Sequence, residues 1–142
     1  MLIDSGVTTP PYVNKRKIFL KRLIFDLDGT LTMGVASNYE EASPNLELIG
    51  RLREFKNQGF EIVISTSRNM RTYEGNLGKI NKHTLPTIQA WLKKHDVPYD
   101  ELYVGKPWCG FEGFYIDDKA IRPSEFVSLT HEQILDLLDK EV

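Results

Sequence analysis

Cysteine is nearly absent from this sequence, since Cys109 is the only one in 142 residues. A single cysteine excludes an internal disulfide and any zinc module built from several cysteines, and it gives no sign of an oxidising compartment. Long apolar runs are also missing, because none approaches the ~18 residues of a membrane-spanning helix. The formal net charge is −2 and the basic residues are scattered, which predicts no surface for nucleic acid. We therefore expect a cytoplasmic protein that binds neither membrane nor nucleic acid.

The length and composition predict one folded domain after an N-terminal extension. A chain of this size buries about 68–70 % of its unfolded surface and needs no covalent staples. The apolar fraction of 41 % and the charged fraction of 27 % are typical of a globular protein. Prolines at 10 and 11 and a basic cluster at 15–17 are typical of a solvated tail. We expect an extension over residues 1–21 and a single domain over residues 22–142.

The stretch from Leu23 to Thr32 is the most informative in the chain. Three apolar residues lead directly into two carboxylates, Asp26 and Asp28, which are followed by Gly29 and two threonines. This pattern predicts a buried strand that ends abruptly in a polar loop. Both carboxylates then lie at the carboxyl end of the strand, where open α/β sheets bind their ligands. Two anions this close need a cation or strong donors nearby, and a divalent metal fits that need.

Apolar runs and helical spacing alternate along the remaining chain. A helix is expected from the cap Ser43-Pro44 to Gly59, another from Thr84 to near His95, and a last one after Thr130. Residues 33–43 and the polar stretch 69–82 are expected to be loops. Strands are predicted at 23–25, 60–65, 101–104, 113–116 and 126–129. This alternation predicts an α/β fold with a mainly parallel sheet and helices on both faces.

Polar residues follow four successive predicted strands. Because the carboxyl ends of parallel strands meet at one edge of a sheet, we expect these residues to converge on one pocket. Their order along the chain is Asp26 and Asp28, then Thr66, then Lys106, then Asp117 and Asp118.

Phosphoryl transfer is the chemistry that such a set suits, since it needs cations, donors and an in-line nucleophile. We expect Asp26 to attack phosphorus and Asp28 to act as general acid and base. Thr66 and Lys106 would hold the phosphate. The four aspartates, at 26, 28, 117 and 118, would form an oxygen shell suited to Mg²⁺.

Each of these assignments has a structural alternative. Asp26 and Asp28 could form a turn that bonds nearby backbone, Thr66 could satisfy a backbone group, and Lys106 could be a surface lysine. Further residues on the loops of this edge are weaker candidates for recognising the leaving group, because such side chains are more often solvated, paired on a helix or packed. They are Arg68, Arg71, Tyr73, Trp108 and Arg122.

The four motifs in this order resemble the pattern of the haloacid dehalogenase-like phosphohydrolase superfamily, over residues 22 to about 130. The resemblance implies a three-layer Rossmann-like fold with sheet order 5-4-1-2-3. It implies Asp26 as the nucleophile, Asp28 as acid and base with its backbone carbonyl on Mg²⁺, and the residues at 66, 106, 117 and 118 in the roles given above. The stretches 62–74, 105–110 and 115–118 are also similar to a subgroup of capsule-biosynthesis phosphatases.

The gaps between the motifs are too short for the cap domain that many members of this superfamily insert. Residues 33–43 can form only a small flap. An open site suits either a large substrate or a neighbouring subunit that completes the pocket, so a homo-oligomer is one interpretation.

The leading hypothesis is a phosphoric monoester hydrolase for a small phosphorylated substrate, such as a sugar or polyol phosphate. A phosphorylatable receiver-like domain is an alternative, although there the acidic pair ends the first strand and the phosphorylated aspartate a middle one. A non-catalytic relative that binds a phosphorylated ligand is the other alternative. Asp26 and Asp28 argue against it, because binding alone needs no nucleophile.

Overall fold

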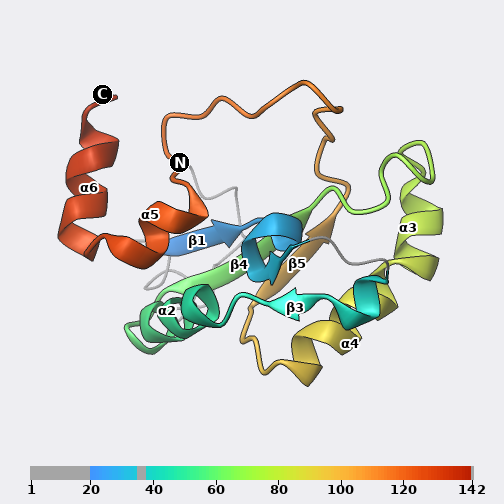
Figure 1. The fold of residues 1–142 in the computed structure, drawn as a ribbon, viewed down its shortest axis with the longest axis horizontal. Coiled ribbons are helices and arrows are strands. Elements are labelled where there is room, and N and C mark those ends of the chain that lie inside the picture. Colours follow the sequence, from blue (N-terminus) through green and yellow to red (C-terminus); the bar gives the residue numbers. More distant parts are fainter. Residues whose placement is uncertain (1–19, 35–37, 142) are drawn as a thin grey trace, which may run out of the picture.

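The computed structural model describes residues 20–34 and 38–141, and its centre is a small parallel sheet (Figure 1). The first elements in chain order are β1 (Arg22–Phe25), η1 (Leu27–Leu31), β2 (Thr32–Met33), η2 (Tyr39–Glu41), β3 (Ser43–Pro44) and α2 (Leu46–Asn57). They are followed by β4 (Glu61–Thr66), α3 (Leu77–His83), α4 (Leu85–Lys94), β5 (Glu101–Val104), α5 (Pro123–Ser128) and α6 (His131–Asp139). Most of the predicted 1–21 extension lies outside the described residues.

The sheet has the order β1-β4-β5, and both pairs are parallel. These strands are the first three that the sequence predicts, in the neighbour order that the resemblance implies. β4 lies in the middle and is rich in β-branched residues, which suit a strand with neighbours on both sides. Phe25 is paired with Ile64, and Ile64 with Leu102, so these three side chains point to the same face.

The hydrophobic core lies on that one face of the sheet. Leu52 and Phe55 of α2, Trp91 of α4 and Phe126 of α5 all belong to the same buried cluster as Phe25 and its neighbours. The Phe25 and Phe126 rings meet edge to face with centroids 5.3 Å apart, an arrangement that aromatic pairs favour. The predicted helix over 43–59 is confirmed in its buried stripe, which comes from the helical spacing of its apolar residues.

The opposite face of the sheet is exposed at its two edge strands and buried at the central strand, where Val63 of β4 is only 2 % exposed. Ile24 of β1 and Tyr103 of β5 point there, and both side chains are more than half exposed. The helices that carry the core cluster lie on one face, and the cover of the second face by helices stays a prediction. The buried apolar residues of α2, α4 and α5 all belong to the core cluster.

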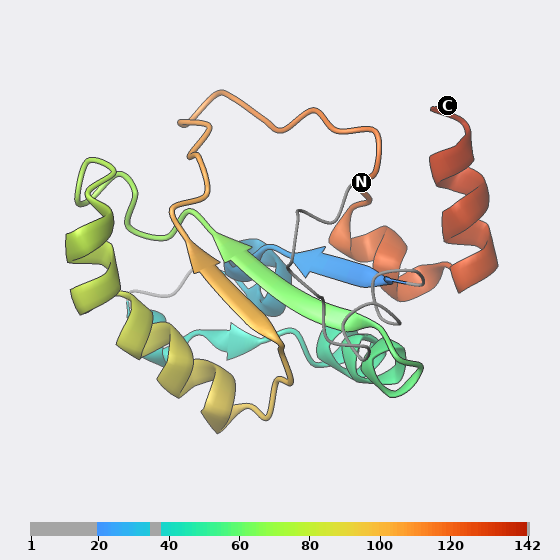
Figure 2. The same cartoon turned by 180° about the vertical axis from the view of Figure 1, so that it is seen from behind.

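Two predicted strands are absent. Residues 113–116 form an irregular, exposed segment, and residues 126–129 lie mostly in α5. α5 forms because Pro123 occupies its first turn and the Glu125 carboxylate accepts a 2.8 Å hydrogen bond from the Arg122 N–H. The long connection from β5 to α5, which we call the 105–122 segment, runs outside the sheet (Figures 1 and 2). The observed sheet thus has three of the five expected strands.

Two predicted loops contain regular structure. Thr32–Met33 and Ser43–Pro44 pair antiparallel, so Ser43 is part of β3 and does not cap the following helix. Asn45 caps α2 instead, since its side chain accepts from the Leu48 N–H. The second half of the stretch 69–82 is α3, with Asn76 as its cap.

The ends of the last two long helices test the capping predictions. Thr84 does not cap α4, because its hydroxyl donates to the Asn69 side chain at 2.7 Å. Thr130 does cap α6, with the reciprocal hydrogen bonds to Gln133 that its spacing predicts. No helix among the described residues is long and apolar enough to span a membrane.

Candidate active site

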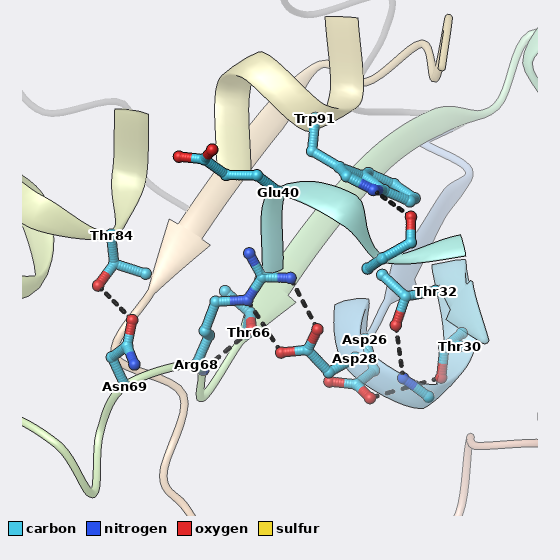
Figure 3. A network of polar contacts seen from close by, with 12 residues as sticks. Asp26, Asp28, Thr30, Thr32, Glu40, Thr66, Arg68, Asn69, Thr84 and Trp91 are labelled. Carbon is cyan, nitrogen blue, oxygen red and sulfur yellow. Dashed lines mark hydrogen bonds and ion pairs between the residues drawn. The ribbon is translucent and has the colours of Figure 1, made fainter. Parts of the chain in front are cut away.

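Asp26 and Asp28 lie on a tight turn directly after β1. Phe25 is buried and ends the strand, and the chain then turns at Gly29, whose φ of +83° is in the region that favours glycine. The Gly29 N–H donates to the Thr32 hydroxyl at 3.1 Å, which closes the turn. Figure 3 shows both carboxylates side by side on this turn.

Asp26 contacts a cation from the other edge of the sheet. The Lys106 ammonium lies 3.4 Å from its Oδ1, and the Thr30 hydroxyl donates to its Oδ2, also at 3.4 Å. Lys106 reaches this position because it follows β5 and donates its backbone N–H to the Thr66 carbonyl at 3.1 Å. The ring of Tyr115 covers the ammonium at 4.4 Å. Both contacts of Asp26 are long, so its carboxylate oxygens keep acceptor capacity.

Thr66 is buried at the carboxyl end of β4. Its hydroxyl oxygen accepts the Arg68 backbone N–H at 3.0 Å. The structural alternative for Thr66, that it satisfies backbone, is thus present in the structure. Its hydroxyl proton is not used in that bond, and the predicted role in phosphate binding stays a prediction.

Asp28 is held by Arg68 in a two-pronged ion pair. Arg68 Nη2 lies 2.7 Å from Asp28 Oδ1, and Nε lies 3.0 Å from Oδ2 (Figure 3). The Arg68 side chain is only 1 % exposed, and its outer face lies under the ring of Tyr39, with 4.2 Å between Cζ and the ring centroid. The sequence pointed to Arg68 as a contact for the leaving group and gave no sign of this pair. Its only signal was the position of Arg68 two residues beyond Thr66.

Two of the other four candidates for leaving-group recognition, Arg71 and Trp108, share a partner in Phe111. Arg71 lies on the ring of Phe111 at 4.8 Å, and Tyr73 stacks on His83. Trp108 packs edge to face with Phe111. Arg122 is exposed at the start of α5. The side chains that bond Asp26 and Asp28 in the described structure are those of Thr30, Lys106 and Arg68, so the predicted roles of these four residues stay predictions.

Asp117 and Asp118 are exposed on the 105–122 segment, and no strand carries them. Asp117 Oδ1 accepts the Lys119 N–H at 2.9 Å, as in a turn. Among the described residues, no three acidic, histidine or cysteine side chains come close enough together to hold a metal ion. The structure therefore gathers Asp26, Asp28 and Lys106, and leaves the late acidic pair outside this group.

The fit of this site to Mg²⁺ is partial. An oxygen-only donor such as the Asp26 carboxylate is what this ion prefers, and its long contacts leave it able to bind. The Asp28 carboxylate is occupied by Arg68. As they lie, the described residues do not complete a magnesium shell, which would need the late acidic pair.

Comparison with known proteins places this chain in a wider group. Residues 23–140 match the family model described as haloacid dehalogenase-like hydrolase. A crystal structure of a target protein from Vibrio cholerae is 63 % identical, with a TM-score of 0.85 over 87 % of this chain and all of that chain. Two structures of the Pnkp1/Rnl/Hen1 RNA repair complex match at 22 % and 21 % identity, over 73 % of this chain and 33 % and 30 % of theirs. Their TM-scores are 0.45 and 0.44. No curated protein matches significantly.

Proposed function

Because this chain belongs to the haloacid dehalogenase-like hydrolases, we propose that it hydrolyses a small phosphomonoester through an aspartyl-phosphate on Asp26. The observation that carries the proposal is the contact between the Asp26 carboxylate and the Lys106 ammonium, 3.4 Å apart at the ends of β1 and β5. It supports the proposal because a carboxylate that attacks phosphorus needs a nearby cation to bind the phosphoryl oxygens.

The reaction has two steps. An Asp26 oxygen bonds to phosphorus as the bond from phosphorus to the leaving oxygen breaks, and Asp28 gives that oxygen its proton. Water then attacks phosphorus, Asp28 takes a proton from it, and the bond between phosphorus and Asp26 breaks to release inorganic phosphate. Thr66 and Lys106 bind the phosphoryl oxygens in both steps.

We propose Mg²⁺ as the cofactor, which would neutralise charge on the phosphate. The residues that would hold it are Asp26, the backbone carbonyl of Asp28, and Asp117 or Asp118. The support is the chemistry of these oxygen donors and the family of the chain.

For the substrate, we propose a sugar or polyol phosphate from the synthesis of a capsule or another polysaccharide. The support is the similarity of residues 62–74, 105–110 and 115–118 to capsule-biosynthesis phosphatases. No cap domain is present among the described residues. A site without a cap leaves room for a phosphate ester that carries a whole sugar or polyol.

A panel of phosphate esters with Mg²⁺ tests the proposal, with released phosphate as the readout. The panel should include sugar phosphates, polyol phosphates and nucleotides at equal concentration. We expect turnover of at least one sugar or polyol phosphate. Asp26→Asn keeps the size of the side chain and removes the nucleophilic oxygen, so it should lower kcat by about 10³-fold or more.

Asp136→Asn is the matched control. This aspartate is exposed on α6, outside the site, and the same chemical change there should leave turnover unchanged. Activity of the Asp26→Asn variant at the parent level would contradict the proposal. Tight binding of a phosphate ester without any turnover would instead identify a non-catalytic binding protein.

A further inference from the structure

Arg68 is the most unusual side chain of the site, because it is a buried cation with an unsatisfied donor. Its side chain is 1 % exposed, and its Nη1 has no hydrogen-bond partner. Burying a guanidinium group is costly unless it is paired and covered. Packing alone does not explain why a charged side chain with an unsatisfied donor is buried at this position.

The pair with Asp28 supplies the first part of that explanation. Nε and Nη2 contact both carboxylate oxygens, at 3.0 and 2.7 Å, in the fork geometry that is specific to arginine. A carboxylate held at both oxygens cannot rotate freely. Asp28 is itself partly exposed, so without this pair its side chain would be free to turn toward solvent.

Tyr39 supplies the second part. Its ring lies 4.2 Å from Arg68 Cζ, and it comes from the flap, which we define as the described residues 38–45. Two hydrogen bonds anchor the flap: Trp91 Nε1 donates to the Ala42 carbonyl at 2.9 Å, and Asn45 Nδ2 donates to the Thr30 carbonyl at 3.1 Å. Tyr39 is 43 % exposed, whereas the Arg68 side chain beneath its ring is 1 % exposed, so the ring stands between Arg68 and water.

We propose that Arg68 is a positioning residue that aims the Asp28 carboxylate, and that the Tyr39 ring keeps this pair in place by covering the guanidinium. This inference rests on the proposed function, because it assigns the pair a role in the step that Asp28 performs. The flap thus acts on catalysis through Arg68. It does so without any contact to the reacting atoms.

Kinetics of Tyr39 variants are the first test. Tyr39→Leu removes the ring from a partly exposed position and should leave the fold intact. We expect it to lower kcat about tenfold with KM within about twofold of the parent, since a misaimed acid affects the reaction more than binding. Tyr39→Phe keeps the ring and should restore kcat to within about twofold. Tyr103→Leu, the same change at an exposed tyrosine of β5, is the matched control and should have no effect.

A double-mutant cycle on unfolding is the second test, and it needs no activity. The cycle combines Tyr39→Leu with Arg68→Met, and its readout is the equilibrium constant of unfolding in urea. A ring over a buried guanidinium should give a coupling of about fivefold in that constant. Arg68→Lys keeps the charge and loses the fork, and it should lower kcat by more than Tyr39→Leu does.

The outcomes separate the two proposals. Coupling in the cycle together with a kcat loss that Tyr39→Phe reverses supports the inference. An absence of coupling between Tyr39 and Arg68 overturns the inference. Coupling with an unchanged kcat also overturns it, because the contact of the Tyr39 ring with Arg68 would then be purely structural. A change in KM alone overturns it as well, since Tyr39 would then contact the substrate. If the parent hydrolyses no phosphate ester, the proposed function fails and the positioning role with it, while the cycle still reports whether the stack exists.

Discussion

β4 and residues 113–116 both contain apolar side chains, among them Ile64 and Ile116, but these two are packed in opposite ways. Ile64 of β4 is fully buried, whereas Ile116 is 90 % exposed. β4 has a parallel neighbour on each side, while the segment that contains Ile116 has no partner strand in the described structure. The comparison shows that apolar content alone does not make a strand, because backbone groups also need a partner.

The same difference separates the candidate site residues. Thr66 ends the central strand and Arg68 follows it; the Thr66 hydroxyl accepts the Arg68 backbone N–H, and the Arg68 side chain donates to Asp28. Asp117 follows the exposed segment and bonds only its own turn. A side chain at the end of a packed strand therefore has a defined position relative to Asp26. The sheet does not fix the position of a side chain on residues 113–117 in the same way.

Truncating the two isoleucines should give the largest contrast. Ile64→Ala removes buried methyl groups from the core, and we expect it to lower the free energy of unfolding by about 2–5 kcal/mol. Ile116→Ala should change it by less than about 0.5 kcal/mol. Urea denaturation followed by circular dichroism measures both. Equal losses would show that residues 113–116 are packed in solution, and the contrast drawn above would be wrong.

The Mg²⁺ dependence of activity tests whether Asp117 and Asp118 of the 105–122 segment help to hold the metal. If Asp117 helps to hold Mg²⁺, Asp117→Asn should raise the Mg²⁺ concentration for half-maximal activity by about tenfold or more, because one charged ligand is lost. Asp118→Asn shows which of the two contributes more, and Asp136→Asn is again the control. An unchanged Mg²⁺ dependence in both variants would remove the late acidic pair from the site.

The smallest expected effect is a pH dependence of the free energy of unfolding that comes from His95. Burial, and then the neighbouring charge of Lys94, lower the pKa of His95 at the end of α4. The native state thus favours neutral His95, so its contribution to stability is complete above the unfolded pKa of about 6.5 and is lost as the pH falls through the lowered native pKa. His95→Gln should flatten the stability profile below about pH 6.5. Urea denaturation between pH 5 and 8 would detect this, and an identical slope in parent and variant would contradict it.

The local sequence pattern predicted those helices and strands whose apolar spacing and capping residues lie within the element itself. The predicted strands β1, β4 and β5 and the helices α2, α4 and α6 are confirmed, because apolar spacing and capping residues act within a few positions of one another. Residues 126–129 were predicted as a strand but lie mostly in α5, which begins at Pro123 and has the Glu125 carboxylate at its first turn. The β2–β3 pair was missed because two-residue strands have almost no pattern of their own.

The sequence by itself determined which residues carry the chemistry, since the type and order of Asp26, Asp28, Thr66 and Lys106 already indicate phosphoryl transfer. Only the tertiary structure decided what each of them contacts. Arg68 and Asp28 are 40 positions apart, and their ion pair exists because β1 and β4 are neighbours in the sheet. Tyr39 reaches the same guanidinium from the flap. Such contacts depend on where strands and loops meet in space, which no local spacing along the chain encodes.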